Sequence, residues 1–242
     1  MSTTATVTAT TDGAVHVIRL DDGKANVVRH DVLQAIHAEL DRIEEDPSVH
    51  AVVIAGRAGQ FSGGFDLKEF AKGPEATRNL VIAGGALCNR LFVFPKVTVT
   101  AVTGNAIAAG AILTMACDWN VGATGAFKMG LPETAIGMAL PIFAHELARV
   151  RLLPPYLTRA TILGELFDPA TSLAAGYLDQ IAAPDDTVDS AIARAHELSA
   201  LTIPAVAQTK RSVRGAVHDL IASTLVDNVT TMTTPPAAGS RP

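Results

Sequence analysis

The segment FSGGFDLK, at residues 61–68, follows a short apolar stretch at 51–55 that is typical of a buried strand. Its paired glycines, Gly63 and Gly64, let the backbone turn tightly and come close to a ligand. The residues after them open a helix, whose first N–H groups lack acceptors within the helix and can face an anion or a polarised carbonyl. On its own the segment is better explained as a turn with Asp66 at a helix start, because short glycine motifs are weak evidence.

A second segment, GNAIAAGAI at residues 104–112, also follows a predicted buried strand, 97–102, and opens a helix predicted at 108–116. Small residues at 108–111 permit a close approach of the backbone, and the first turn again offers unpaired N–H donors. Alone, this segment is better explained as a buried helix that needs small residues for packing. Together, two helix starts that each follow a buried strand are one way to aim two N–H donors at one oxygen.

The rest of the chain predicts an α/β protein. Alternating residues at 6–10 and 15–20 predict a β-hairpin, and apolar residues recur at helical spacing within 33–43 and 77–94. Strands and helices thus alternate through roughly the first 140 residues, as expected for βαβ units. The elements predicted beyond Pro141 are helices at 142–150, 155–164, 187–200 and 205–226, and one strand at 178–182.

The composition of the chain argues against several classes of function. The 242 residues suit one sizeable domain, with or without a small helical appendage. The net charge of −5 and the absence of a Lys/Arg run give no sign of a nucleic-acid partner. Cys88 and Cys117 have neither metal-ligand nor disulfide-framework spacing, so no metal is expected. The longest apolar run, 106–117, is too short to span a bilayer, and 1–11 show no targeting signal, so we expect a cytoplasmic protein.

The two segments resemble the oxyanion segments of the crotonase (enoyl-CoA hydratase/isomerase) family. That family carries a pattern close to F-[SA]-[AG]-G-x-D-[LI]-K and, further along the chain, a strand, G-x-[AC]-x-[GA]-G-G and a helix that runs to C-D. This chain matches at 61–68 and from Gly104 to Cys117–Asp118. The resemblance implies that the N–H groups of Phe65 and Ala109 form an oxyanion hole. Two such donors stabilise the enolate that forms when a proton leaves the carbon beside a thioester carbonyl.

The resemblance also implies the fold and the assembly. The expected fold is the crotonase (ClpP-like) β-β-α spiral core with a helical C-terminal part. We expect a core at 1–200, a C-terminal helical trimerisation segment at 201–230 and a disordered tail at 231–242. The expected assembly is a homotrimer or a dimer of trimers, without a membrane or nucleic-acid partner.

Catalytic roles follow from the same likeness. Hydratases of the family usually use two glutamates, one of them three positions beyond the second oxyanion residue, where this chain has Ile112. The other is kept in the pair Pro132–Glu133, although Glu133 could also be a simple first-turn helix carboxylate. A single carboxylate suits an isomerase, which takes a proton from C2 and returns it at C4. The segment at 130–137, GLPETAIG, resembles G-L-N-E-T-x-L-G of mitochondrial-type Δ3,Δ2-enoyl-CoA isomerases, with proline in place of asparagine.

We therefore expect an enoyl-CoA isomerase of fatty-acid oxidation that needs no cofactor beyond the coenzyme A of its acyl-CoA substrate. The expected substrate contacts are Lys24, Ala25, Val27, Gly63, Gly64, Phe65, Asp66, Leu67, Lys68, Ile107, Ala109 and Pro132. Lys24 and Lys68 are candidates for phosphate or adenine contact, and are equally consistent with ordinary surface lysines. His145 and Glu146 are expected near the acyl pocket, and Asp118 is expected to be structural. An enoyl-CoA hydratase and a non-catalytic acyl-CoA binder are the alternatives.

Overall fold

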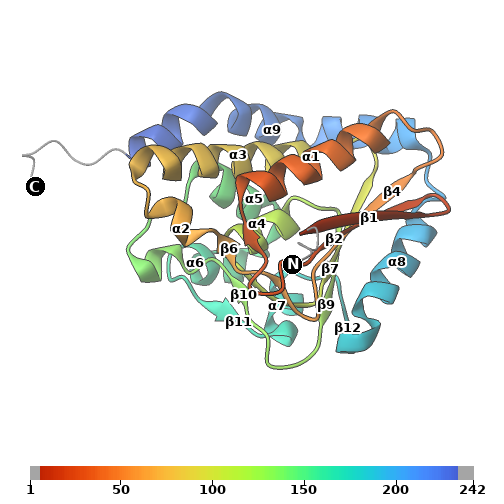
Figure 1. The fold of residues 1–242 in the computed structure, drawn as a ribbon, viewed down its shortest axis with the longest axis horizontal. Coiled ribbons are helices and arrows are strands. Elements are labelled where there is room, and N and C mark those ends of the chain that lie inside the picture. Colours follow the sequence, from red (N-terminus) through yellow and green to blue (C-terminus); the bar gives the residue numbers. More distant parts are fainter. Residues whose placement is uncertain (1–5, 234–242) are drawn as a thin grey trace, which may run out of the picture.

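The largest unit of the computed structural model, which describes residues 6–233, is a six-stranded sheet (Figure 1). Its first two strands form the predicted antiparallel hairpin, and all other neighbours are parallel. In spatial order the strands are β1 (Val7–Asp12), β2 (Val15–Leu20), β4 (Ala51–Ala55), β7 (Val97–Val102), β9 (Trp119–Ala123) and β12 (Gln180–Ala182). β9 was not predicted, and β12 is shorter than the strand predicted at 178–182.

Two smaller sheets lie beyond the ends of these strands. One has four strands in the spatial order β11 (Leu166–Phe167), β10 (Met129–Gly130), β8 (Gly104–Ile107) and β5 (Gly59–Ser62). The other pairs β3 (Val27–Val28) with β6 (Gly64–Phe65) in parallel. Both predicted oxyanion segments therefore contain strand residues, β5 and β6 in the first and β8 in the second, in addition to the helix starts.

The chain passes from the large sheet to the four-stranded sheet three times, from β4 to β5, from β7 to β8 and from β9 to β10. Helices follow each passage, so the predicted β-β-α spiral is confirmed. The corners between the sheets are tight. A Cβ atom on Gly104 would lie 2.0 Å from the carbonyl carbon of Gly59, and one on Gly56 would lie 2.5 Å from Cα of Phe61. These corners therefore require glycine.

Helices cover both faces of the large sheet. The α-helices are α1 (His30–Glu44), α2 (Leu67–Phe70), α3 (Pro74–Phe92), α4 (Ala109–Met115), α5 (Ile142–Arg151), α6 (Pro154–Thr161), α7 (Pro169–Ala175), α8 (Thr187–Leu198) and α9 (Ile203–Thr233). Two 3₁₀ helices, η1 (Glu133–Ile136) and η2 (Pro184–Asp186), complete the set described. Within residues 6–233, no helix combines the length and apolarity needed to cross a membrane.

The large sheet divides the core into two layers. On one face, Ile18, Val52 and Ile54 pack in one cluster with residues of α1, α3, α4, α5 and α9. On the other face, Val17 and Val53 pack against α8. Neighbouring residues of a strand point to opposite faces, so a strand covered on both sides is apolar throughout, as all five residues of β4 are.

Helix α9 packs against this core. Ile221, Leu225 and Val229 recur every four residues on α9 and join the cluster that contains Leu80 and Leu87 of α3. Figure 1 shows α9 lying along α3. The domain boundary expected at 200/201 stays a prediction. The trimerisation role stays a prediction. Of the tail predicted at 231–242, residues 231–233 are helical, and 234–242 lie outside the described residues.

Candidate active site

The two glycine-rich segments lie against each other. Gly64 has φ of +92°, and a Cβ atom there would lie 3.0 Å from both Cβ of Ala108 and the carbonyl oxygen of Ile107. Gly110 makes a similarly close contact in the other direction, since a Cβ atom there would lie 2.6 Å from the carbonyl oxygen of Ser62. Only glycine fits without movement of the backbone at these two positions. The start of α4 and strand β6 are thereby held side by side.

The backbone at the start of α4 is unusual. Ala108 has φ of +52°, a region that residues other than glycine seldom adopt, and its N–H donates to the carbonyl oxygen of Gly130 at 2.9 Å. Ala109 is the first residue of α4, where N–H groups have no acceptor within the helix. Backbone strain of this kind is often found at functional sites. Here it turns the chain sharply between β8 and the first N–H groups of α4.

The loop that carries Phe65 is fixed from both sides. The N–H of Asp66 donates to the carbonyl oxygen of Val28 at 3.1 Å, and its carboxylate accepts from the N–H of Lys68 at 2.9 Å. Asp66 thus caps α2, in the loop-fixing position expected for it. Phe65 itself is half-buried. Its ring lies where a Cβ atom on Gly84 of α3 would be only 2.5 Å away, so glycine at 84 makes room for it.

The expected substrate contacts in the loop at 24–27 lie directly beside those at 63–64. The N–H of Gly63 donates to the carbonyl oxygen of Ala25 at 2.8 Å, and Val27 pairs with Gly64 in the β3–β6 sheet. Lys24 is exposed, and its carbonyl oxygen accepts from Nε of Arg57 at 2.8 Å. Lys68 is also exposed, on α2. The structure therefore brings the predicted backbone positions together, while both lysine side chains extend into solvent.

A cavity of about 390 Å³ opens beside these segments. Of the predicted site residues, Gly63, Phe65, Leu67, Ile107, Pro132 and Glu133 line it. Ala109 instead borders a smaller neighbouring void, although Ala108, which precedes it, lines the main cavity. His145 and Glu146 do not line it. Those two side chains lie 3.3 Å apart on α5, and Arg149 approaches Glu146 at 3.5 Å.

Glu133 is an ionisable residue that lines this cavity. It lies in the first turn of η1 and is 9% exposed, and its Oε2 has no hydrogen-bond partner among the described residues. Burial raises the pKa of Glu133 to about 7 because water cannot reach the charged form. Ile112, on α4, lines the same cavity and is 2% exposed. Among the described residues around the cavity, Glu133 carries the only ionisable side chain.

The sequence model of the enoyl-CoA hydratase/isomerase family matches residues 10–238. The chain belongs to the enoyl-CoA hydratase/isomerase family. The crystal structure of an enoyl-CoA hydratase from Mycobacterium ulcerans is 37% identical, with a TM-score of 0.90 over 95% of this chain and all of that one. An enoyl-CoA isomerase of Mtb is 36% identical, with a TM-score of 0.88 over 93% and 98% of the two chains.

The curated mouse protein named mitochondrial enoyl-CoA delta isomerase 1 is 29% identical over 210 residues, which are 85% of this chain and 72% of that protein. The relatives thus confirm the predicted family and its crotonase fold. Their names are divided between hydratase and isomerase, so similarity alone does not select one reaction for this family member.

This family member has a buried aromatic layer near Glu133. Burial, and after it the charge of Glu133, raises the pKa of the Tyr177 hydroxyl. That hydroxyl has no hydrogen-bond partner among residues 6–233. The Tyr177 ring meets Phe167 edge-on, with centroids 6.0 Å apart. The nearness of Tyr177 to Glu133 was not predicted from the sequence.

Sequence reasoning missed the residues of α3, α5 and α9 that line the cavity. These lining residues are Thr77 and Val81 of α3, Phe143 of α5, and Val229, Met232 and Thr233 of α9. An apolar side chain that faces a cavity has the same helical spacing as one that faces the core. No sequence signal therefore distinguished the two, and only the folded chain shows which side chains reach the cavity.

Proposed function

We propose that this chain is a Δ3,Δ2-enoyl-CoA isomerase that uses Glu133 as its only acid–base group. The observation that carries the proposal is the pairing of Glu133 with Ile112 in one cavity. Glu133 is the only ionisable side chain among the described lining residues, and Ile112 is where a second carboxylate would stand in a hydratase. An apolar side chain can neither take up nor deliver a proton.

The chemistry needs two proton transfers and one stabilised intermediate. The Glu133 carboxylate removes a proton from C2, and the electron pair moves onto the thioester oxygen as an enolate. The N–H groups of Phe65 and Ala109 would then donate to that oxygen, and such donors are each worth about 2.7–4 kcal/mol in comparable sites. When the enolate collapses, the C3–C4 electrons take the proton back from Glu133 at C4. The double bond has moved from C3 to C2, and the carboxylate is restored.

The environment of Glu133 supports this role. A general base is most effective when its pKa lies near the working pH. Burial brings the pKa of Glu133 to about 7, and the free Oε2 leaves one oxygen available to a proton. The mostly apolar lining also excludes water, which protects an enolate from quenching.

The test is Glu133→Gln, which keeps the shape of the side chain and removes the base. We expect kcat for a 3-enoyl-CoA to fall by at least about 10²-fold, as for the loss of a general base, with binding of a saturated acyl-CoA nearly unchanged. Glu146→Gln is the matched control, because Glu146 is equally buried, at 9% exposure, but lies outside the cavity lining. If the Glu133 variant keeps most of its kcat, the assigned role is wrong.

Hydration of a 2-enoyl-CoA is the second candidate, favoured by the hydratase name of the Mycobacterium ulcerans relative. Adding water requires activation of the water and delivery of a proton, which commonly takes two groups. Ile112 removes one of the two from this chain. A wild-type protein that hydrates 2-enoyl-CoA and leaves 3-enoyl-CoA unchanged would favour this candidate.

A further inference from the structure

The cavity extends beyond the reacting segments to the last two turns of α9. Val229, Met232 and Thr233 of α9 line it together with Thr77 and Val81 of α3. The two threonine hydroxyls both donate to backbone carbonyl oxygens. Thr77 Oγ1 donates to the carbonyl oxygen of Gly73 at 3.1 Å, and Thr233 Oγ1 donates to that of Val229 at 2.8 Å. This wall therefore presents a mainly apolar surface.

We propose that the end of α9, through Val229 and Met232, sets the longest straight acyl chain that the cavity accepts. The proposal rests on the proposed function only in placing the acyl chain of a CoA thioester in this cavity. Val229 is 1% exposed and belongs to the packed core, so it cannot move aside without cost. Met232 is 37% exposed, which places it toward the rim.

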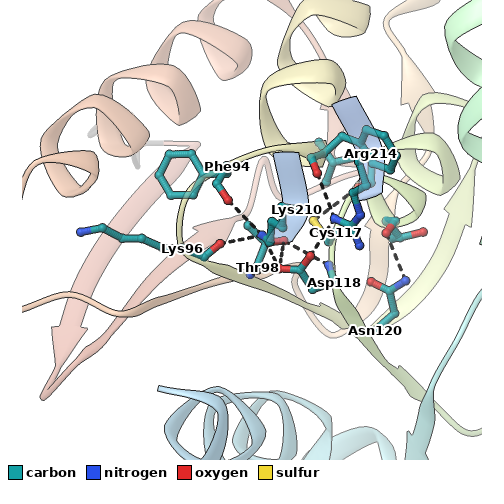
Figure 2. A network of polar contacts seen from close by, with 11 residues as sticks. Phe94, Lys96, Thr98, Cys117, Asp118, Asn120, Lys210 and Arg214 are labelled. Atoms are coloured by element: carbon teal, nitrogen blue, oxygen red, sulfur yellow. Dashed lines mark hydrogen bonds and ion pairs between the residues drawn. The ribbon is translucent and has the colours of Figure 1, made fainter. Parts of the chain in front are cut away.

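Such a limit requires that α9 be held firmly, and two sets of contacts hold it. Figure 2 shows Lys210 and Arg214 of α9 converging on Asp118, which follows α4. The Lys210 ammonium lies 2.5 Å from one Asp118 oxygen, and the Arg214 guanidinium lies 2.8 Å from the other. Asp118 also accepts from the N–H of Thr98 in β7 at 2.8 Å. Asp118 thus has the structural role expected for it.

The second set of contacts lies beside the proposed limit. Asn228 Oδ1 accepts from the N–H of Ile142 at 2.8 Å, at the first residue of α5. This N–H has no acceptor within α5, so the Asn228 side chain satisfies it. Because Asn228 immediately precedes Val229, the hydrogen bond fixes the position of Val229 relative to Phe143 of α5, which also lines the cavity. Residues of α5 and α9 therefore form this wall together, and the hydrogen bond holds the two helices in contact.

We therefore expect affinity to rise with the length of the acyl chain up to a limiting length and then to stop rising. We call this limiting length the break. Each methylene that leaves water for an apolar cavity raises affinity about fourfold. The gain continues while the chain grows within the cavity and stops when its end reaches α9. A larger side chain at 229 should move the break to a shorter acyl chain, and a smaller one should move it to a longer chain.

The experiment measures Kd by calorimetry for straight saturated acyl-CoA thioesters that differ by two carbons. The variants are Val229→Phe, Val229→Ala and Met232→Ala, each checked for folding by circular dichroism. Val226→Phe is the matched control, because Val226 is the same residue type on the same helix, is 56% exposed and does not line the cavity. We expect the break to shift in opposite directions for the two Val229 variants and to stay in place for the control.

If Val229→Ala and Met232→Ala fold and keep the wild-type dependence on chain length, α9 does not set the limit. The alanine variants keep this test valid even if Val229→Phe fails to fold. Saturated thioesters cannot be isomerised, so the outcome is independent of the proposed reaction. A protein that binds with a break in chain length but isomerises nothing would overturn the isomerase proposal and leave this one standing.

Discussion

Glu133 titrates near neutral pH because its carboxyl group is buried, and its Oε2 lacks a hydrogen-bond partner in the described part of the chain. Burial disfavours the charged form and raises its pKa to about 7 from an ordinary value of 4.5. Only the carboxylate can remove a proton from C2. We therefore predict that kcat for a 3-enoyl-CoA rises with pH, with a midpoint near 7, and then levels off. A kcat that is constant between pH 5 and 9 would contradict the role of Glu133.

The same shift predicts a pH-dependent change in stability. Because the pKa of Glu133 is higher in the folded state than in the unfolded state, the folded protein holds more protons between about pH 4.5 and 7. As pH rises through that window, ionisation of Glu133 lowers the free energy of unfolding, by up to about 3 kcal/mol at full ionisation. Glu133→Gln should unfold at higher denaturant concentration than the wild type at pH 8, with a much smaller difference at pH 5. An equal difference at both pH values would refute this explanation.

Ile112 leads to a prediction about hydration of 2-enoyl-CoA, a reaction that we expect to be weak in the wild type. Ile112→Glu restores a second carboxyl group in the cavity, so hydration of 2-enoyl-CoA should increase from a low level. The variant should also lose stability, because Ile112 is 2% exposed and a carboxyl group there leaves water. The measurement is absorbance loss of 2-enoyl-CoA, alongside urea unfolding. Wild-type hydration as fast as isomerisation would show that Ile112 does not exclude this chemistry.

At the scale of single residues, the sequence predicted those whose chemistry or backbone is distinctive. Glu133, Gly63 and Gly64 were identified because a carboxylate in a known motif and paired glycines stand out in a sequence. Val229 and Tyr177 were not linked to the site, because their side chains look like ordinary core residues until the chain folds. The assignment of Glu133 itself came from family resemblance and not from spacing alone.

At the scale of elements, the two oxyanion segments depend on a contact between β6 and the start of α4. Gly64→Ala places a Cβ atom 3.0 Å from Ala108 and Ile107, so the segments must separate. A displacement near 1 Å can cost about 10²-fold in rate, and the separation needed here is a fraction of that, so we predict a smaller kcat loss, roughly tenfold. The measurement is kcat for a 3-enoyl-CoA together with the free energy of unfolding.

Gly73→Ala is the matched control for this contact. Gly73 also has positive φ, +119°, but a Cβ atom there meets nothing within 4 Å. Both variants should lose roughly 1–3 kcal/mol of stability from backbone strain at positive φ. Only Gly64→Ala should lose activity, and a similar loss in both variants would mean that the β6–α4 contact is not what positions the donors.

The longer elements were predicted and the shortest were not. The hairpin, β4, β7 and the larger helices follow from hydrophobic periodicity, which needs several residues to be detected. β3, β6, β10 and β11 are two residues each, and they exist because the folded chain brings partners alongside. For α9 the sequence predicted a helix at 205–226, but the real helix continues to Thr233, and those added turns carry the residues that line the cavity.

At the scale of the whole molecule, the large sheet supplies a rigid base from which β5, β8 and β10 lead to the site. The spiral brings 61–68, 104–112 and 130–137, which are distant in the sequence, to one cavity. α9 then returns from the far end of the chain to complete its wall. This arrangement places the proposed base, the two proposed backbone donors and the proposed acyl cavity close together. The predicted trimer remains a prediction.

Whether one carboxylate acts alone can be decided by assaying the wild-type protein with a 3-enoyl-CoA and a 2-enoyl-CoA side by side. We predict rapid formation of 2-enoyl-CoA from the first substrate and little or no 3-hydroxyacyl-CoA from the second. Hydration of the 2-enoyl-CoA at a rate equal to or above isomerisation, or no turnover of either substrate despite acyl-CoA binding, would contradict this prediction.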